Sequence, residues 1–318
     1  MTGSWITLRG GFADNRGIAA EDKMFAIVGI LVVVGAVVGG YLFEHGHLRV
    51  LMQPGELLII GGAAIGTLLI ANPPRILKKV AGSLGGILGS SKFTQAKYID
   101  SLKMMFDLLS KARKDGLVAL EADIEEPEKS PVISKNAAFV KDHHARDFVC
   151  DTLRMAIAGG VEPFDVDQMM ELDMEVHHQE SADSVSALTT MAESLPGLGI
   201  VAAVLGVVIT MGSLGGPPEQ IGEKVAAALV GTFLGILMCY GFVGPLAANI
   251  AKQAEEERAY YHVLRVVIVA FMKGSPPIMA VEAARRAVPT HVRPSFAQVE
   301  AACKNRSDAG SDATAKAA

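Results

Sequence analysis

The sequence has few of the features that mark enzymes, nucleic-acid-binding proteins or secreted proteins. Only 20% of its 318 residues are charged and the formal net charge is −5, which excludes a strongly basic nucleic-acid-binding protein as the default. Its three cysteines are odd in number and far apart, so we predict free thiols and no disulfide framework. Phosphate-loop, HExxH and GxSxG motifs are all missing, and we therefore predict no enzymatic activity.

Histidines give little reason to expect a metal or cofactor. His143-His144 and His177-His178 are adjacent pairs, whose side chains diverge on a helix. We interpret them as solvated histidines and predict no metal site.

Long apolar stretches are what the sequence does have. Half of the residues are apolar and 33 are glycine, a composition typical of helices that pack closely in a bilayer. Four stretches have about the length that crosses a membrane. The pattern predicts an all-α polytopic membrane protein with two transmembrane hairpins, the first from spans at about 24–43 and 56–74, the second from spans at about 195–214 and 225–249.

Basic residues predict the orientation of these hairpins. The connections 44–56 and 212–224 each hold one lysine or arginine, whereas the stretch 75–114 holds nine. The positive-inside rule then places both hairpin loops outside, and both termini and the middle segment in the cytoplasm. We expect a bacterial inner-membrane protein with a helical cytoplasmic domain at 77–194, cytoplasmic helices at 250–303 and a disordered tail at 304–318.

Within the middle segment, helical spacing of apolar residues predicts one helix that stops at Gly116 and another over 146–158. A third helix is predicted to open at Pro163 and to run towards the third span. After the fourth span, helix is predicted to continue to Met272, and 275–277 to restart a last short helix.

Small residues follow one face of the third span, and two interpretations of them stay open. The face carries Pro196, Gly199, Ala203, Gly206, Thr210 and Ser213; Thr232 lies on a similar face of the fourth span. Close helix–helix packing is one interpretation. A smooth channel wall with hydroxyl groups at Thr210 and Thr232 is the other.

A proton pathway needs an ionisable group inside the membrane, usually a carboxylate. Taken as 24–43, 57–71, 195–214 and 225–249, the four apolar stretches contain no Asp, Glu, Lys, Arg or His. The chain is therefore predicted to need a partner helix that supplies the carboxylate, if it conducts protons at all.

Ordered blocks of sequence resemble the MotA/PomA family from Met24 to about Glu300. The segments that carry the resemblance are MFAIVG at 24–29, QPGEL at 53–57, SLPGLGIVAAV at 194–204, VGTFLGIL at 230–237, YGFVGPL at 240–246, PPIMAVE at 276–282 and RPSF at 293–296. The resemblance implies a flagellar stator subunit: five copies surround two copies of a MotB-type, peptidoglycan-binding partner whose membrane Asp accepts the proton. The ring's cytoplasmic part is then expected to turn the rotor protein FliG.

The same resemblance implies roles for particular residues. Pro196 and Pro245 match the family's functional prolines at the cytoplasmic ends of the channel helices, although proline starts or kinks helices in any protein. Thr232 matches a pore-facing hydroxyl, and Glu193 an acidic group at the cytoplasmic mouth. Ala203 stands where sodium-driven members tend to carry Thr; a methyl group cannot coordinate Na⁺, so the transported ion is expected to be H⁺.

Two charged residues match the family's torque-generating block. Arg113 and Glu121 lie in SKARKDG at 110–116 and LEADIE at 120–125, and by this match they face opposite charges on FliG. Without the match they would be solvated surface charges. Electrostatic contacts suit a rotor interface because they form and break quickly.

Residues 1–23 precede the usual start of the family. We interpret them as the product of an upstream start codon, with a genuine cytoplasmic extension as the alternative. An ExbB/TolQ-type proton-channel subunit is the second functional hypothesis, although such chains usually have three spans. A membrane scaffold that conducts no ions is the third.

Overall fold

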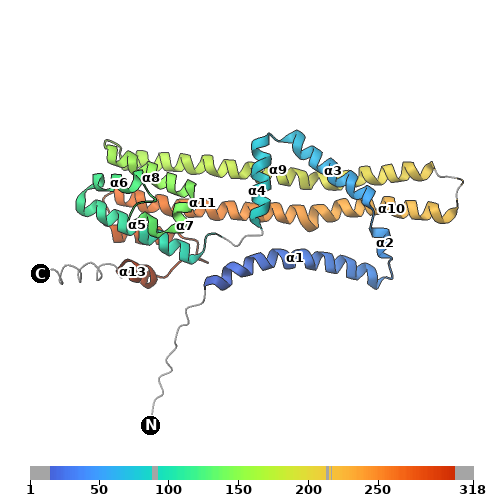
Figure 1. Cartoon of the computed structure of the whole chain (residues 1–318), viewed down its shortest axis with the longest axis horizontal. Helices are drawn as coiled ribbons and strands as arrows, with labels where there is room; N and C mark the ends of the chain where they lie inside the picture. Colours follow the sequence, from blue (N-terminus) through green and yellow to red (C-terminus); the bar gives the residue numbers. More distant parts are fainter. Residues whose placement is uncertain (1–14, 88–91, 213–214, 216, 305–318) are drawn as a thin grey trace, which may run out of the picture.

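The computed structural model of the chain describes residues 15–87, 92–212, 215 and 217–304. Every regular element in these residues is a helix, which confirms the predicted fold class (Figure 1). The helices are α1 (Asn15–Phe43), α2 (Leu48–Leu51), α3 (Pro54–Ala71), α4 (Pro74–Ile87), α5 (Gln95–Asp115), η1 (Leu117–Leu120), α6 (Glu121–Glu125), η2 (Ile133–Lys135), α7 (Ala137–Lys141), α8 (His143–Ala158), α9 (Pro163–Met211), α10 (Pro218–Leu237), η3 (Met238–Val243), α11 (Gly244–Met272), α12 (Pro277–Ala287) and α13 (Phe296–Lys304).

Four helical segments of the described residues are long and apolar enough to cross a membrane, as predicted. Large apolar side chains stay exposed along them, which suits a surface covered by lipid. Examples are Phe25, Leu31, Leu58, Ile70, Val208 and Leu229. The helices extend differently from the predicted spans. α1 begins at Asn15 and contains the apolar segment Phe25–Phe43, while α3 ends at Ala71, because Pro73 and Pro74 interrupt the helix and start α4.

Two continuous helical paths form the long axis of the molecule. α9 runs unbroken for 49 residues, about 74 Å at the usual rise per residue, with Pro196 inside it. α10, the π-helical turn η3 and α11 together run from Pro218 to Met272 beside α9 (Figure 1). The π-helical turn ends at Val243, two residues before Pro245, so the altered hydrogen bonding accommodates a residue that has no backbone N–H to donate.

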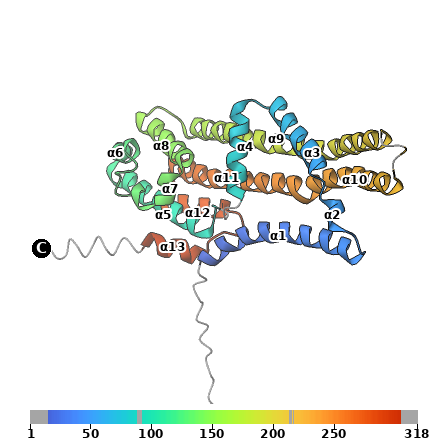
Figure 2. The same ribbon diagram turned by 45° about the vertical axis from the view of Figure 1, so that its right-hand side comes forward.

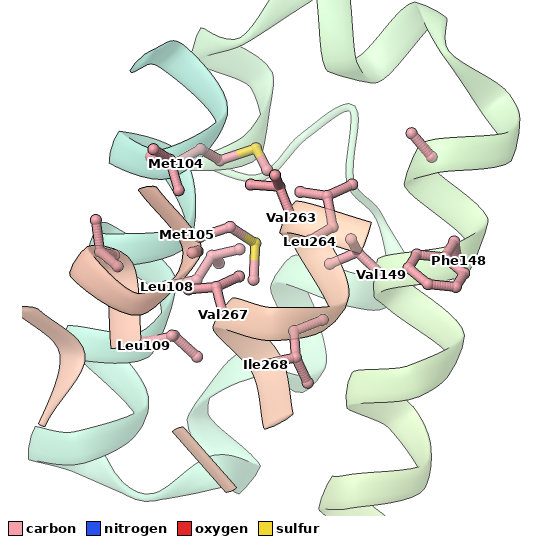
Figure 3. Packing of buried hydrophobic residues seen from close by; sticks show 14 of the residues in the cluster. Met104, Met105, Leu108, Leu109, Phe148, Val149, Val263, Leu264, Val267 and Ile268 are labelled. Atoms are coloured by element: carbon pink, nitrogen blue, oxygen red, sulfur yellow. The ribbon is translucent and has the colours of Figure 1, made fainter. Parts of the chain in front are cut away.

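The far ends of α9 and α11 belong to a helical domain with its own core. Figure 3 shows α5 side chains, among them Met105 and Leu108, packed against Val263, Leu264 and Val267 of α11, while α8 closes the side. All five are at most 1% exposed. The apolar end of α11 is therefore part of the core of this domain.

Local sequence signals set the ends of these helices. Thr94 accepts a hydrogen bond from the Lys97 amide and begins α5; Gly116, at φ +86°, follows its last residue. Asp142 caps α8 in the same way. The helix ends predicted at Gly116, Ala158 and Pro163 are confirmed. Two short helices, α12 and α13, follow α11, where one was predicted.

α4 lies across the long helices, as Figures 1 and 2 both show. Its Val80 is buried with Leu188 of α9 and Ile250 of α11. Lys79 donates to Glu180 of α9 at 3.2 Å. α4 therefore braces the two long helices where they leave the spans. The start of the predicted extension, residues 1–14, and the tail beyond residue 304 lie outside the described residues.

Candidate ion pathway and rotor-facing surface

The third and fourth spans approach each other through glycine. A Cβ added at Gly235 would lie 2.6 Å from the carbonyl oxygen of Leu195, and one at Gly206 would lie 2.7 Å from the Cβ of Ala228. One at Gly199 would lie 3.0 Å from the carbonyl oxygen of Gly231. These backbones can be this close only because the side chains are missing. Of the two interpretations of the small-residue stripe, the structure of the single chain favours helix packing.

The two predicted channel hydroxyls differ in their surroundings. Thr210 is 4% exposed, and its Oγ1 donates to the carbonyl oxygen of Gly206 in its own helix at 2.8 Å. Within one chain, Thr210 is thus a buried packing residue, and its place on a channel wall stays a prediction. Thr232 and Ala203 are only partly buried, and the Ala203 nitrogen lies 3.3 Å from a Cβ built at Gly231, the neighbour of Thr232. The structure therefore brings Ala203 and Thr232 to one level of the bundle.

The remaining pathway candidates lie nearer the helical domain. Glu193 is exposed on α9, one helical turn before the partly buried Pro196. Pro245 is exposed and lines a groove of about 480 Å³ between α1 and α11, together with Phe25 and Phe242. The structure thus places the two prolines in different surroundings.

One residue of the bundle was missed by sequence reasoning. Glu56, in the first turn of α3, is only 9% exposed, and its Oε2 makes no hydrogen bond to the described residues. This oxygen lies 2.8 Å from a Cβ built at Gly231 of α10. The four apolar stretches as counted in the sequence hold no carboxylate, but Glu56 adds one at the edge of the second, inside α3. The sequence already indicated that Glu56 could lie at the edge of the second span, because this residue directly precedes the apolar run 57–71.

The predicted rotor-facing residues lie on the surface of the helical domain. Arg113, in the last turn of α5, and Glu121, at the start of α6, are both exposed. Beneath them, Asp123 is 2% exposed and accepts hydrogen bonds from Lys111 Nζ at 2.7 Å and Ser130 Oγ at 2.5 Å. This buried network ties α6 to the end of α5 and so fixes the spacing of the two charges.

Histidines from the two adjacent pairs in the sequence lie close together where α8, α9 and α11 meet. The rings of His144 and His177 are 4.9 Å apart, and His177 Nε2 lies 3.4 Å from Glu257 Oε1. Among the described residues, no group of histidine, cysteine or acidic side chains is arranged to hold a metal ion.

Comparison with known proteins decides the family. Residues 27–116 match the family model for the N-terminal part of motility protein A, and residues 140–262 match that of the MotA/TolQ/ExbB proton channel family. Motility protein A of Escherichia coli strain K12 is 38% identical over 277 residues, which cover 87% of this chain and 94% of that protein. Motility protein A of Salmonella typhimurium is 36% identical with the same coverage. The chain belongs to the motility protein A family.

Solved structures agree with this assignment at the level of the fold. The structure of C. jejuni MotAB has a TM-score of 0.71 at 19% identity, with 86% of this chain and 99% of that chain covered. The flagellar MotAB stator complex from Bacillus subtilis has a TM-score of 0.65 at 22% identity, with 86% and 97% covered. This motility protein A homologue is thus a subunit of the flagellar stator type within a proton channel family, as the resemblance implied.

Proposed function

We propose that this motility protein A homologue is the membrane subunit of a proton-driven stator, with MotB-type and FliG partners. The continuity of its long helices carries the proposal. α9 passes without a break from the third span into the helical domain, and the fourth span continues through η3 and α11 into the same core. A displacement of the membrane half is therefore transmitted to Arg113 and Glu121 along rigid helices rather than through a flexible linker.

The proposed orientation follows from charge. With the α9–α10 connection and the α1–α3 connection outside, the lysine-rich and arginine-rich segment after α3 lies in the cytoplasm. Arg75 and Lys79, at the start of that segment, both lie beside Glu180, at 3.6 and 3.2 Å. Both termini and the helical domain then face the cytoplasm, where a rotor would be reached.

The transported ion is proposed to be H⁺. Ala203 and Thr232 lie at one level, and this level offers one side-chain hydroxyl where sodium-driven relatives are expected to offer two. Na⁺ needs several oxygen ligands, whereas a proton needs only a carboxylate or a chain of hydrogen bonds. The principal carboxylate is proposed to come from the MotB-type helix, around which five copies of this chain would assemble.

Along this pathway, Thr232 and Ala203 are proposed to line the route, Glu193 to receive protons at the cytoplasmic mouth, and Pro196 and Pro245 to set the angle between spans and domain. Thr210, buried within one chain, is proposed to join this set in the assembled ring.

Deletion of the gene tests the function. Cells are expected to keep flagellar filaments, seen by electron microscopy, but to stop swimming, and the wild-type gene should restore swimming. Swimming speed should persist when K⁺ replaces Na⁺ in the medium and collapse with a protonophore. Normal swimming of the deletion strain, in a cell with no second stator gene, would contradict the stator function and favour an ExbB/TolQ-type role.

Charge reversal tests the rotor interface. R113E and E121K should each slow swimming, while reversal of matching charges on FliG should restore part of the loss. D115K, which reverses an exposed charge beside Arg113, is the control for general surface effects. Equal effects of all three variants would contradict specific roles for Arg113 and Glu121.

A further inference from the structure

The buried carboxylate of Glu56 is the feature that the proposed roles leave unexplained. Its residue is 9% exposed, and Oε2 is fully enclosed without a hydrogen-bond partner in the described residues. Burying a polar group without a partner costs about 1–3 kcal/mol in proteins, and ionisable residues within spans are rare where they have no function. A side chain placed there at such a cost needs a physical reason.

The surroundings of Glu56 place it where three spans meet. Its Oε2 lies 2.8 Å from a Cβ built at Gly231, and that same position lies 3.3 Å from Ala202 Cβ and from the Ala203 nitrogen. Glycine at 231 is thus what leaves room for the carboxylate. The acidic group of α3 enters the contact between α9 and α10, directly beside the level of Ala203 and Thr232.

The depth of this contact along the fourth span follows from helix geometry. Gly231 is about 9 Å along the helix from Val225, where the apolar stretch begins, and about 21 Å from Pro245, where it nears the domain. Glu56 therefore lies in the third of the span nearest the hairpin loops. By the proposed orientation, this is the third nearest the outer solution.

A purely structural role explains Glu56 less well. An acidic residue in the first turn of a helix is stabilised by the helix dipole, and commonly accepts a hydrogen bond from a free backbone N–H. Such a residue is usually exposed. The enclosed Oε2 of Glu56 accepts no such bond, and it points at a neighbouring span rather than back to its own helix.

We infer that Glu56 is a proton-binding carboxyl group of this chain, on the outer side of the pathway. This rests on the proposed function. The Glu56 carboxylate takes a proton from a hydronium ion of the outer solution and releases water; its new O–H bond then breaks as the carboxylate of the MotB-type partner takes the same proton. Glu56 returns to its starting state, so the two steps balance. The pathway then contains a carboxylate of the ring subunit in series with that of the partner.

The test replaces Glu56 by Gln, which keeps the size and hydrogen-bonding groups of the side chain but cannot exchange a proton in this way. E44Q is the matched control, because Glu44 belongs to the same connection and is exposed. The readout is the rotation-speed increment each time one stator unit joins a bead-loaded motor, since this increment does not depend on how much protein is made. Increments are measured at external pH 6, 7 and 8.

E56Q is expected to reduce the increment at least fivefold and to flatten its dependence on external pH, while E44Q leaves both unchanged. E56D, which keeps a carboxylate on a shorter side chain, should give larger increments than E56Q. Wild-type increments and pH dependence in E56Q would overturn the inference while leaving the stator function intact. E56D increments no larger than those of E56Q would also overturn the inference. The same holds if neither the E56Q nor the E56D protein adds any stator unit to the motor. Failure of the stator function itself would appear differently, as swimming in the deletion strain.

Discussion

Alanine at Gly235 should separate the third and fourth spans. The added Cβ would lie 2.6 Å from the Leu195 carbonyl oxygen and 2.9 Å from the Gly199 Cα. Both are backbone atoms, so no side chain can rotate out of the way. Ordinary contact needs about 3.5 Å, and the two helices would have to move apart by about 0.5–1 Å to restore it.

Such a displacement has a measurable cost. Overpacking by one methyl group costs about 1–3 kcal/mol in well-packed protein. Inside a bilayer, the loss is not offset by apolar burial, because lipid tails solvate the separated faces as well as the partner helix does. We therefore expect G235A to unfold several degrees below wild type when the purified protein is heated in detergent and its helical circular dichroism is followed.

Three glycines in the contact between α9 and α10 differ in how closely an added Cβ would approach its neighbours, so they allow a graded test. G206A, with a closest approach of 2.7 Å, should be nearly as destabilising as G235A, and G199A, with 3.0 Å, less so. G222A is the matched control, since nothing lies within 4 Å of its added Cβ and alanine favours helix by about 1 kcal/mol over glycine. A melting temperature of G235A equal to that of G222A would refute the packing argument.

Three further predictions concern the helical domain. D123A removes the acceptor buried beside Lys111, so it should reduce stability by about 1–3 kcal/mol in thermal unfolding and slow swimming, whereas the exposed-site control E125A should do neither. L108A creates a cavity in a core position that is 0% exposed and should cost about 2–5 kcal/mol, with increased hydrogen exchange along α5 and α11 as the measurement. Hydrogen bonds from Arg285 lower the pKa of Glu282 from 4.5 to about 2, so their stabilisation is complete above about pH 4.5 and is lost as the pH falls towards 2. E282Q should therefore lose less stability than wild type between pH 5 and pH 3, and an equal loss would contradict the pairing.

The fold could be predicted because its signals are local. Each span is set by an apolar run, and the helix ends at Gly116 and Pro163 are set by residues whose backbone preferences need no tertiary context. Boundaries within continuous helix are different. Polarity alone distinguishes the part of α9 in the membrane from the part in the helical domain. The two parts form one continuous helix in the structure, and no helix-ending residue marks the boundary between them.

The candidate site was less predictable, because it depends on which faces meet. The spacing of Thr210 on the small-residue face could not reveal that its hydroxyl would be satisfied by its own helix at Gly206. Nor could spacing place Ala203 beside the neighbour of Thr232. These relations arise only when α9 and α10 are packed, and the roles of Pro196, Pro245, Glu193, Arg113 and Glu121 remain predictions from resemblance.

Glu56 shows why a search for charges inside apolar runs can miss the relevant one. The residue stands at the boundary of its own span, yet α3 crosses α10 in such a way that this boundary meets Gly231, well inside the fourth span. Depth in a membrane protein is therefore a property of the neighbouring helix as much as of the residue's own sequence position. A glycine opposite the end of a span lets an end residue reach into the bundle, and a substitution at Gly231 should affect proton transfer through Glu56 without altering any ionisable group.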